Sequence, residues 1–169
     1  MRSLPEVLKR VEKVKQHRLA SARETTQGLA LTPTLFGEIR QPKEDYLAIP
    51  EVSSENRPYI PIGFLHRSVV PTNKLYTFSG AGLYHFGVLG SAMHMAWIKS
   101  VAGRLKSDFQ YSAGIVYNNF PWPRDPSERQ TKAIEEAAQG VLDARAKFPD
   151  ASLADIYDPI AMPPELCLP

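Results

Sequence analysis

The sequence has almost no cysteine. Its single thiol, Cys167, lies close to the end of the chain. A lone cysteine excludes an internal disulfide framework and any zinc site built from several cysteines. The composition therefore suits a reducing compartment, and we expect a cytoplasmic protein.

The chain also lacks a segment suited to crossing a membrane. Residues 75–98 carry no formal charge, but they include glycines, serines and two histidines, which are unfavourable in lipid. The first 24 residues are charged throughout, unlike a signal peptide. We expect no membrane contact, and we interpret residues 75–98 as part of a buried helix.

Catalytic motifs are missing as well. We find no glycine-rich turn between a strand and a helix that would hold a nucleotide or S-adenosylmethionine, and no phosphate-binding lysine loop. Serine, histidine and aspartate are scattered, so no nucleophile–base set and no carboxylate–lysine nuclease cluster can be assembled. His85 and His94 are expected to be core histidines, because no third metal ligand stands at a suitable spacing. The chain alone is therefore not expected to catalyse a reaction.

Charge is unevenly distributed along the chain. Residues 1–23 hold seven basic side chains and two acidic ones, whereas residues 124–169 hold five basic and nine acidic ones. A basic front and an acidic tail indicate that one part of the surface faces a polyanion, although a solvated helix face gives the same pattern.

Short strand segments and longer helices make up the predicted fold. Apolar residues at helical spacing predict an amphipathic helix over residues 4–22, and nothing precedes it that would pack beneath its apolar stripe. We therefore expect the chain to be part of a longer protein. Strands are predicted from aromatic and β-branched residues in segments 46–49, 59–65, 69–70 and 75–78, with a hairpin made of 109–111 and 115–117.

A long central helix is expected over residues 83–102. Its core would include Met93, Met95 and Trp97, and Gly87 lies on a small-residue face that another backbone can approach closely. Further helices are predicted near residue 128 and after Ser152, which has a capping partner in Asp155. The predicted fold class is α+β: a mixed or antiparallel sheet with a buried central helix and an N-terminal amphipathic helix, then a small helical C-terminal segment. The expected domains are residues 1–123 and 124–169.

The segment after the central helix carries a pattern suited to reading DNA. Lys106, Asp108 and Gln110 alternate, so in an extended strand their side chains project from one face. Lysine donates to guanine, aspartate accepts from cytosine and glutamine suits adenine. Phosphate contacts could come from the basic residues Lys74, Lys99, Arg104, Arg57 and Arg67. A solvent-facing strand with a weak Lys–Asp pair would show the same alternation.

Several motifs together resemble the C-terminal part of MmeI-like restriction-modification proteins, which join a nuclease, an adenine methyltransferase and a target recognition domain in one chain. The resemblance covers nearly the whole sequence. Its motifs are Tyr59-Ile-Pro-Ile-Gly-Phe-Leu65, Leu83-Tyr-His-Phe-Gly-Val-Leu89, Met93-His-Met-Ala-Trp97, Gly103-Arg-Leu-Lys-Ser-Asp108, Ile115-Val-Tyr-Asn-Asn-Phe-Pro-Trp-Pro123 and Ser152-Leu-Ala-Asp-Ile-Tyr-Asp158.

The resemblance implies a DNA target recognition domain up to about residue 123. It implies that Lys106, Asp108 and Gln110 are base-reading positions, with Lys74 a further candidate. It also implies double-stranded DNA as a partner, a methyltransferase domain in cis or as a separate chain, and S-adenosylmethionine for the parent enzyme but no cofactor in this chain. The function expected is sequence-specific DNA recognition within a DNA adenine methyltransferase or type II restriction-modification enzyme.

Two other hypotheses stay open at this point. In the first, the chain is a protein-interaction or structural domain whose basic N-terminal helix docks onto a partner subunit. In the second, the chain is an enzyme that uses His85 or His94.

Overall fold

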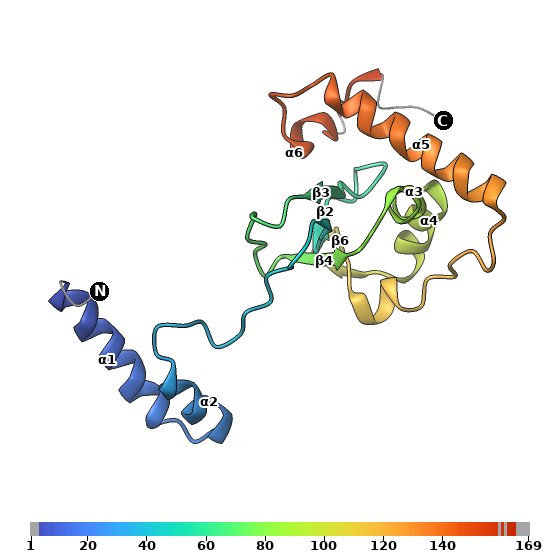
Figure 1. The fold of residues 1–169 in the computed structure, drawn as a ribbon. Coiled ribbons are helices and arrows are strands. Elements are labelled where there is room, and N and C mark those ends of the chain that lie inside the picture. Colours follow the sequence, from blue (N-terminus) through green and yellow to red (C-terminus); the bar gives the residue numbers. More distant parts are fainter. Residues whose placement is uncertain (1–3, 159, 161, 165–169) are drawn as a thin grey trace. The chain divides into compact units, whose positions relative to one another are not determined.

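The computed structural model describes residues 4–158, 160 and 162–164. Figure 1 shows the path of the chain, which divides into two compact units, Met1–Arg40 and Gln41–Pro169. Each unit is described by itself. The lone cysteine, Cys167, lies outside the described residues. Among the described residues, no helix is long and apolar enough to cross a membrane.

The first unit is helical. It contains α1 (Pro5–Leu19), α2 (Glu24–Gly28) and the 3₁₀ helix η1 (Leu29–Leu31), so the predicted helix over residues 4–22 is confirmed but ends earlier. Arg18 ties α1 to the segment that follows: its guanidinium donates to the carbonyl oxygens of Leu29 at 2.8 Å, Thr32 at 3.0 Å and Leu35 at 2.8 Å. These three bonds fix the segment that follows α1 against the last turn of the helix.

The second unit contains two small antiparallel sheets. One has the order β3 (Gly63–Leu65), β1 (Tyr46–Pro50), β4 (Leu75–Ser79). The other has the order β2 (Val52–Ser53), β6 (Asp108–Gln110), β5 (Gly103–Leu105). All four strand pairs are antiparallel, which confirms the predicted α+β class with an antiparallel sheet.

Two of the predicted strands differ from the observed ones. The strand predicted over residues 59–65 is reduced to β3, because Pro61 has no N–H to donate and the backbone folds back there, with Ile62 N donating to Ile60 O at 2.8 Å. Val69 and Val70 are exposed and lie in a loop, where Val69 N donates to the carbonyl oxygen of His66. The strand prediction for residues 69–70 was therefore wrong.

The long central helix is interrupted. It consists of α3 (Leu83–Leu89) and α4 (Ala92–Val101), because Gly90 ends the first helix and Ser91 adopts an extended conformation and caps the second. The Ser91 hydroxyl accepts from His94 N at 3.1 Å. The break rotates the second half of the apolar stripe, so Met95 is buried as predicted, whereas Met93 is 63% exposed, contrary to the prediction.

The predicted hairpin of residues 109–111 and 115–117 is also wrong. Residues Ala113–Tyr117 form a π-helical turn, η2, instead of a strand. The Ser112 hydroxyl accepts from Ile115 N at 3.0 Å, and the Ser112 carbonyl accepts from Val116 N at 2.8 Å. These bonds and the burial of Val116 outweigh the strand preference of its β-branched neighbours. The observed hairpin joins β5 to β6.

The C-terminal segment is part of this unit and packs against α3 and the core. It contains α5 (Glu128–Ala146) and α6 (Leu153–Ile156), the second capped by Ser152 and Asp155 as predicted. A Cβ at Gly87 would lie 2.7 Å from the Ile134 side chain, so the expected close approach at this glycine takes place against α5. Arg145 of α5 donates to Ile62 O at 2.8 Å and to the Tyr157 hydroxyl at 2.7 Å, and so ties α5 to the sheet and to α6.

Candidate nucleic-acid interface

The β5–β6 hairpin carries the predicted reading residues in an arrangement that differs from a single strand. Lys106 lies in the two-residue turn, with a left-handed backbone (φ 57°), and its side chain is exposed. Asp108 and Gln110 lie on β6, where the buried Phe109 points to the opposite face. The expectation of one row of three side chains is therefore wrong for Lys106, which is at the hairpin tip, and holds for the other two.

Arg104 lies on the same face of this hairpin as Phe109, and its side chain is exposed. It is paired with Phe109 across the two strands, and its guanidinium lies over the Phe109 ring, 4.0 Å from the centroid. It donates to Ser107 O at 2.7 Å and lies 3.5 Å from the Glu55 carboxylate. Asp108 accepts a long hydrogen bond from Glu55 N at 3.4 Å. The hairpin therefore presents Lys106, Asp108 and Arg104 on a partly fixed scaffold.

Glu51 brings two of the predicted reading residues together. Its carboxylate accepts from Lys74 Nζ at 2.8 Å, and its backbone N–H donates to Lys74 O. The Glu51 carbonyl accepts from Tyr111 N at 2.7 Å, which places Glu51 beside Gln110 as well. The Lys74 hydrogen bond lowers the pKa of the Glu51 carboxyl; desolvation opposes this, and the Lys74 charge and a Gln110 hydrogen bond reinforce it. Lys74, Gln110 and Glu51 thus form one polar cluster, the Glu51 cluster.

Glu51 was missed by the sequence reasoning. Its partner Lys74 is 23 residues away, and no local pattern connects them. Only the antiparallel pairing of β1 with β4, which continues past Pro50 and Leu75, places the two side chains side by side.

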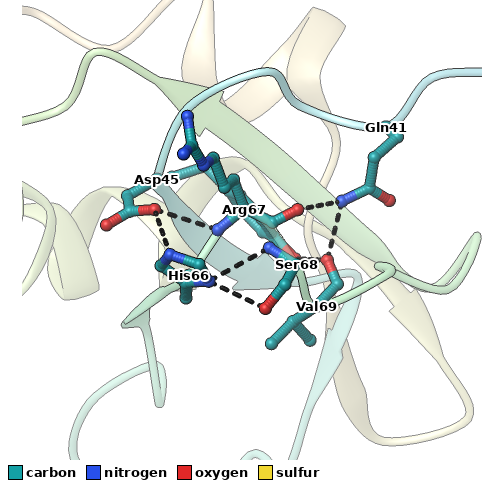
Figure 2. Close-up of polar contacts among 7 residues, drawn as sticks. Gln41, Asp45, His66, Arg67, Ser68 and Val69 are labelled. Atoms are coloured by element: carbon teal, nitrogen blue, oxygen red, sulfur yellow. Dashed lines mark hydrogen bonds and ion pairs between the residues drawn. The ribbon is translucent and has the colours of Figure 1, made fainter.

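Arg67 lies in a loop whose backbone is held from several directions (Figure 2). Its N–H donates to Asp45 Oδ1 at 2.9 Å, and its carbonyl accepts from Gln41 Nε2 at 2.7 Å. Gln41 also donates to Val69 O at 2.9 Å, and His66 Nε2 lies 3.7 Å from Asp45 Oδ1. The exposed Arg67 guanidinium makes no hydrogen bond or ion pair with any described residue. The hydrogen bonds therefore fix the backbone of the loop, while the Arg67 guanidinium stays free to contact another molecule.

The two remaining predicted phosphate contacts are separate from the hairpin. Lys99 is exposed on the last turn of α4. Arg57 is half-buried in the loop after β2, and its Nε is buried without a hydrogen-bond partner among the described residues. The structure therefore brings Lys74 to Gln110, keeps Asp108 and Arg104 on the hairpin, and leaves Arg57, Arg67 and Lys99 at other places on the unit.

The two histidines of the central helices have structural partners. His94 is 1% exposed; its Nδ1 lies 2.7 Å from Leu89 O, and its Nε2 lies 3.3 Å from the Tyr111 hydroxyl. Burial lowers the pKa of His94, against the opposing effect of the Leu89 carbonyl. His85 accepts from Gly82 N at 3.1 Å. Among the described residues, no three His, Cys, Asp or Glu side chains are grouped to hold a metal ion.

The turn at Gly80–Gly82 qualifies the sequence argument about cofactors. It joins β4 to α3, so a glycine-containing turn between a strand and a helix does exist. However, β4 is the edge of an antiparallel sheet and α3 has seven residues, with the N–H of Gly82 already bonded to His85. This turn does not fit the cradle that a nucleotide or S-adenosylmethionine requires between a parallel strand and a long helix.

Comparisons with known proteins match nearly the whole chain. A family model described as "MmeI, target recognition domain" matches residues 1–124, and one described as "MmeI, C-terminal domain" matches residues 126–168. DNA methyltransferase A of Bacillus subtilis (strain 168) is 42% identical over 166 residues, which is 98% of this chain and 19% of that protein.

A solved structure gives the same assignment. The Type IIL restriction-modification enzyme MmeI in complex with DNA matches with 51% identity and a TM-score of 0.86, over 98% of this chain and 22% of that one. The chain thus spans about a fifth of the length of these two relatives. With a target recognition model matching 124 of its residues, the chain belongs to the MmeI family.

Proposed function

We propose that this chain is the sequence-specific DNA recognition module, with its C-terminal helical segment, of a DNA adenine methyltransferase or type II restriction-modification enzyme. The match of residues 1–124 to the MmeI target recognition domain carries this proposal. The geometry supports it, because the second unit exposes a hairpin and a polar cluster whose side chains suit the edges of base pairs.

In this proposal, the β5–β6 hairpin and the Glu51 cluster face a groove of double-stranded DNA. Asp108 and Gln110 lie on one face of β6, Lys106 extends the reach of the hairpin at its tip, and Lys74 lies beside Gln110 through Glu51. Lysine donates to the acceptors of guanine, aspartate accepts from the amino group of cytosine, and glutamine suits adenine. Because Lys74 is exposed, its ion pair with Glu51 is weak enough to be exchanged for contact with a base.

Phosphate contacts would come from the basic residues around these readers. Arg67 is the best placed, because its loop is fixed and its guanidinium is unpaired within the part of the chain that the structure describes. Arg104, Arg57 and Lys99 are further candidates. Such contacts set the position of a protein on the duplex without selecting a sequence.

The methyltransferase part of the larger protein is the proposed partner in cis. It would hold S-adenosylmethionine and receive the flipped adenine, because the Gly80–Gly82 turn of this chain does not fit such a cofactor. The two family models meet near residue 125, which supports a division of this chain into residues 1–123 and 124–169.

A second role, docking onto the rest of the protein, is favoured by the surface of the first unit. The helix α1 buries none of its residues, and Leu4, Val7, Leu8 and Val14 are exposed along it. Apolar side chains at this spacing on one helix are suited to packing against another protein surface. In this proposal, α1 joins the recognition module to the methyltransferase part.

Binding of the 169-residue chain to a pool of randomised duplexes, measured at several salt concentrations, tests the proposed function. We expect the affinity to fall steeply with added salt, and one sequence to be enriched over the pool, because phosphate contacts depend on salt and base contacts on sequence. Binding without any sequence preference would overturn the recognition role and leave the docking role.

A further inference from the structure

An open cleft with aromatic walls lies between the first sheet and η2. Its volume is about 260 Å³, and Tyr76, Phe78, Tyr111 and Tyr117 line it, with Ile49 at its base. The Tyr76 and Tyr111 rings are 6.0 Å apart, and the Phe78 and Tyr117 rings are 5.7 Å apart at a steep angle. Tyr117, which forms one wall, belongs to the π-helical turn. Such turns are rare in proteins, and those that occur often lie at functional sites.

Unused polar groups surround the mouth of this cleft. Asn118 lines it and is exposed, and its side-chain amide makes no hydrogen bond within the described part of the chain. The hydroxyls of Tyr76 and Tyr117 likewise hydrogen-bond to no described residue, whereas the Tyr111 hydroxyl is bonded to His94. Burial raises the pKa of Tyr117, so its hydroxyl stays protonated and remains able to donate.

The cleft opens on the same side of the first sheet as the Glu51 cluster. Tyr76 pairs with Ile49, and the hydrogen bond from Glu51 N to Lys74 O continues this pairing two residues further. Side chains two residues apart on a strand share a face, so Lys74 lies beside Tyr76 and Glu51 beside Ile49. Tyr111 directly follows Gln110. A ligand in the cleft would therefore adjoin the residues proposed to read DNA.

We propose that this cleft binds one unstacked nucleobase of the DNA. Aromatic rings offer stacking surfaces to any base, and an amide at the rim suits the hydrogen-bonding edge of a base that has lost its partner. An enzyme that withdraws a target base from a duplex leaves the opposite base unpaired, and this orphaned base is the proposed occupant. The inference rests on the proposed function, because it requires that the Glu51 cluster faces DNA.

The test compares a fully paired duplex that carries the preferred site with a series of duplexes. Each member of the series contains a single unpaired base at a different position within the site. We expect the 169-residue chain to bind one member of the series about tenfold more tightly than the paired duplex, because stacking of one base on an aromatic side chain contributes that much. Placing 2-aminopurine at this position should give an emission that is quenched on binding.

Variants then locate the site. Tyr117→Ala should abolish the preference for the unpaired base, while Tyr117→Phe should keep most of it because the ring remains. Asn118→Ala changes an exposed side chain that makes no contact needed for folding, and should reduce the preference, whereas Asn56→Ala at another exposed asparagine should not.

The outcomes separate this inference from the proposed function. Equal binding of all unpaired duplexes and of the paired one, with unchanged 2-aminopurine emission, would overturn the nucleobase site even if sequence preference persists. A preference that survives both Tyr117→Ala and Asn118→Ala would also overturn it, because the base would then bind elsewhere. Loss of all sequence preference in the unmodified chain would instead contradict the proposed function.

Discussion

The two compact units of the chain differ in how far they bury their apolar side chains. Among the described residues up to Arg40, Ala30 is the one apolar residue that is buried. The unit exposes large apolar side chains along α1 and after it: Leu4, Val7, Leu8, Val14, Leu19, Leu31, Leu35, Phe36 and Ile39. The second unit instead buries a continuous core that includes Leu47, Phe86, Ile98 and Val116.

This difference indicates which unit carries its own stability. A segment of about 40 residues without a core rarely folds alone. The apolar surface that it removes from water is too small to offset the loss of chain entropy on folding. The second unit has both a core and a polar rim formed by the hairpin and the Glu51 cluster. We therefore expect the first unit to depend on a surface outside itself, whereas the second has the core to hold the side chains proposed to read DNA in fixed positions.

The largest expected effect is a difference between two matched substitutions. Ile98→Ala in α4 removes a fully buried side chain and should lower the free energy of unfolding by about 2–5 kcal/mol. Leu8→Ala in α1 removes a side chain that is 42% exposed and should change it by no more than about 0.5 kcal/mol. Chemical denaturation of the 169-residue chain measures both.

Equal costs for the two substitutions would break the comparison between the units. If Leu8→Ala is neutral in this chain but destabilises a protein in which the chain is joined to the proposed methyltransferase part, the comparison is sharpened, because α1 then packs against that part.

The second prediction concerns DNA and places recognition in the second unit. Replacing Lys106 and Asp108 together by alanine should alter the preference at one base pair, at a cost of about 1–3 kcal/mol for the original base. Arg67→Ala should weaken binding to all sequences alike and reduce the slope of the salt dependence by about one. Selection from randomised duplexes, repeated at several salt concentrations, distinguishes these results.

Lysines of α1 provide the control for this experiment. Lys9→Ala and Lys13→Ala change the charge of the first unit and should leave the preferred sequence unchanged. An unaltered preference in the Lys106 and Asp108 double variant would show that the reading residues are assigned wrongly. A changed preference after α1 substitutions would place recognition in both units.

The sequence could predict an element where the residues that determine it lie close together along the chain. Local periodicity predicted α1, and the Ser152–Asp155 pair predicted the start of α6. The break at Gly90–Ser91 also has a local signal, a glycine followed by a capping serine, although the apolar stripe continues across it. These elements depend on neighbours within four residues, which a sequence displays directly.

The parts of the site that could not be predicted depend on tertiary structure. The turn at Lys106–Ser107 has neither glycine nor asparagine, although Lys106 adopts a left-handed backbone, so no turn signal marks the hairpin. The Glu51–Lys74 pair arises from strand pairing across 23 residues. The alternation of Asp108 and Gln110 was predicted because it needs only an extended strand, whereas the place of Lys106 needed the hairpin.

The smallest expected effect is a dependence of stability on pH that comes from His94 alone. Burial lowers its pKa below the ordinary value of 6.5, so the unfolded state binds a proton more readily than the folded state. The stabilisation from neutral His94 is complete above pH 6.5 and is lost as the pH falls towards the lowered pKa, by at most about 1.4 kcal/mol per pH unit.

The neighbours of His94 do not account for the dependence of stability on pH. Its ring contacts Tyr111 and Phe120, and Tyr111, whose pKa is raised by burial, stays neutral throughout this range. Denaturation curves between pH 5 and 8 should therefore show the loss in the unmodified chain and in His17→Gln, an exposed histidine of α1, but not in His94→Gln. If the loss of stability persists in His94→Gln, another titratable group causes it. If the loss disappears in His17→Gln, the first unit contributes to stability, contrary to what its exposed apolar surface indicates.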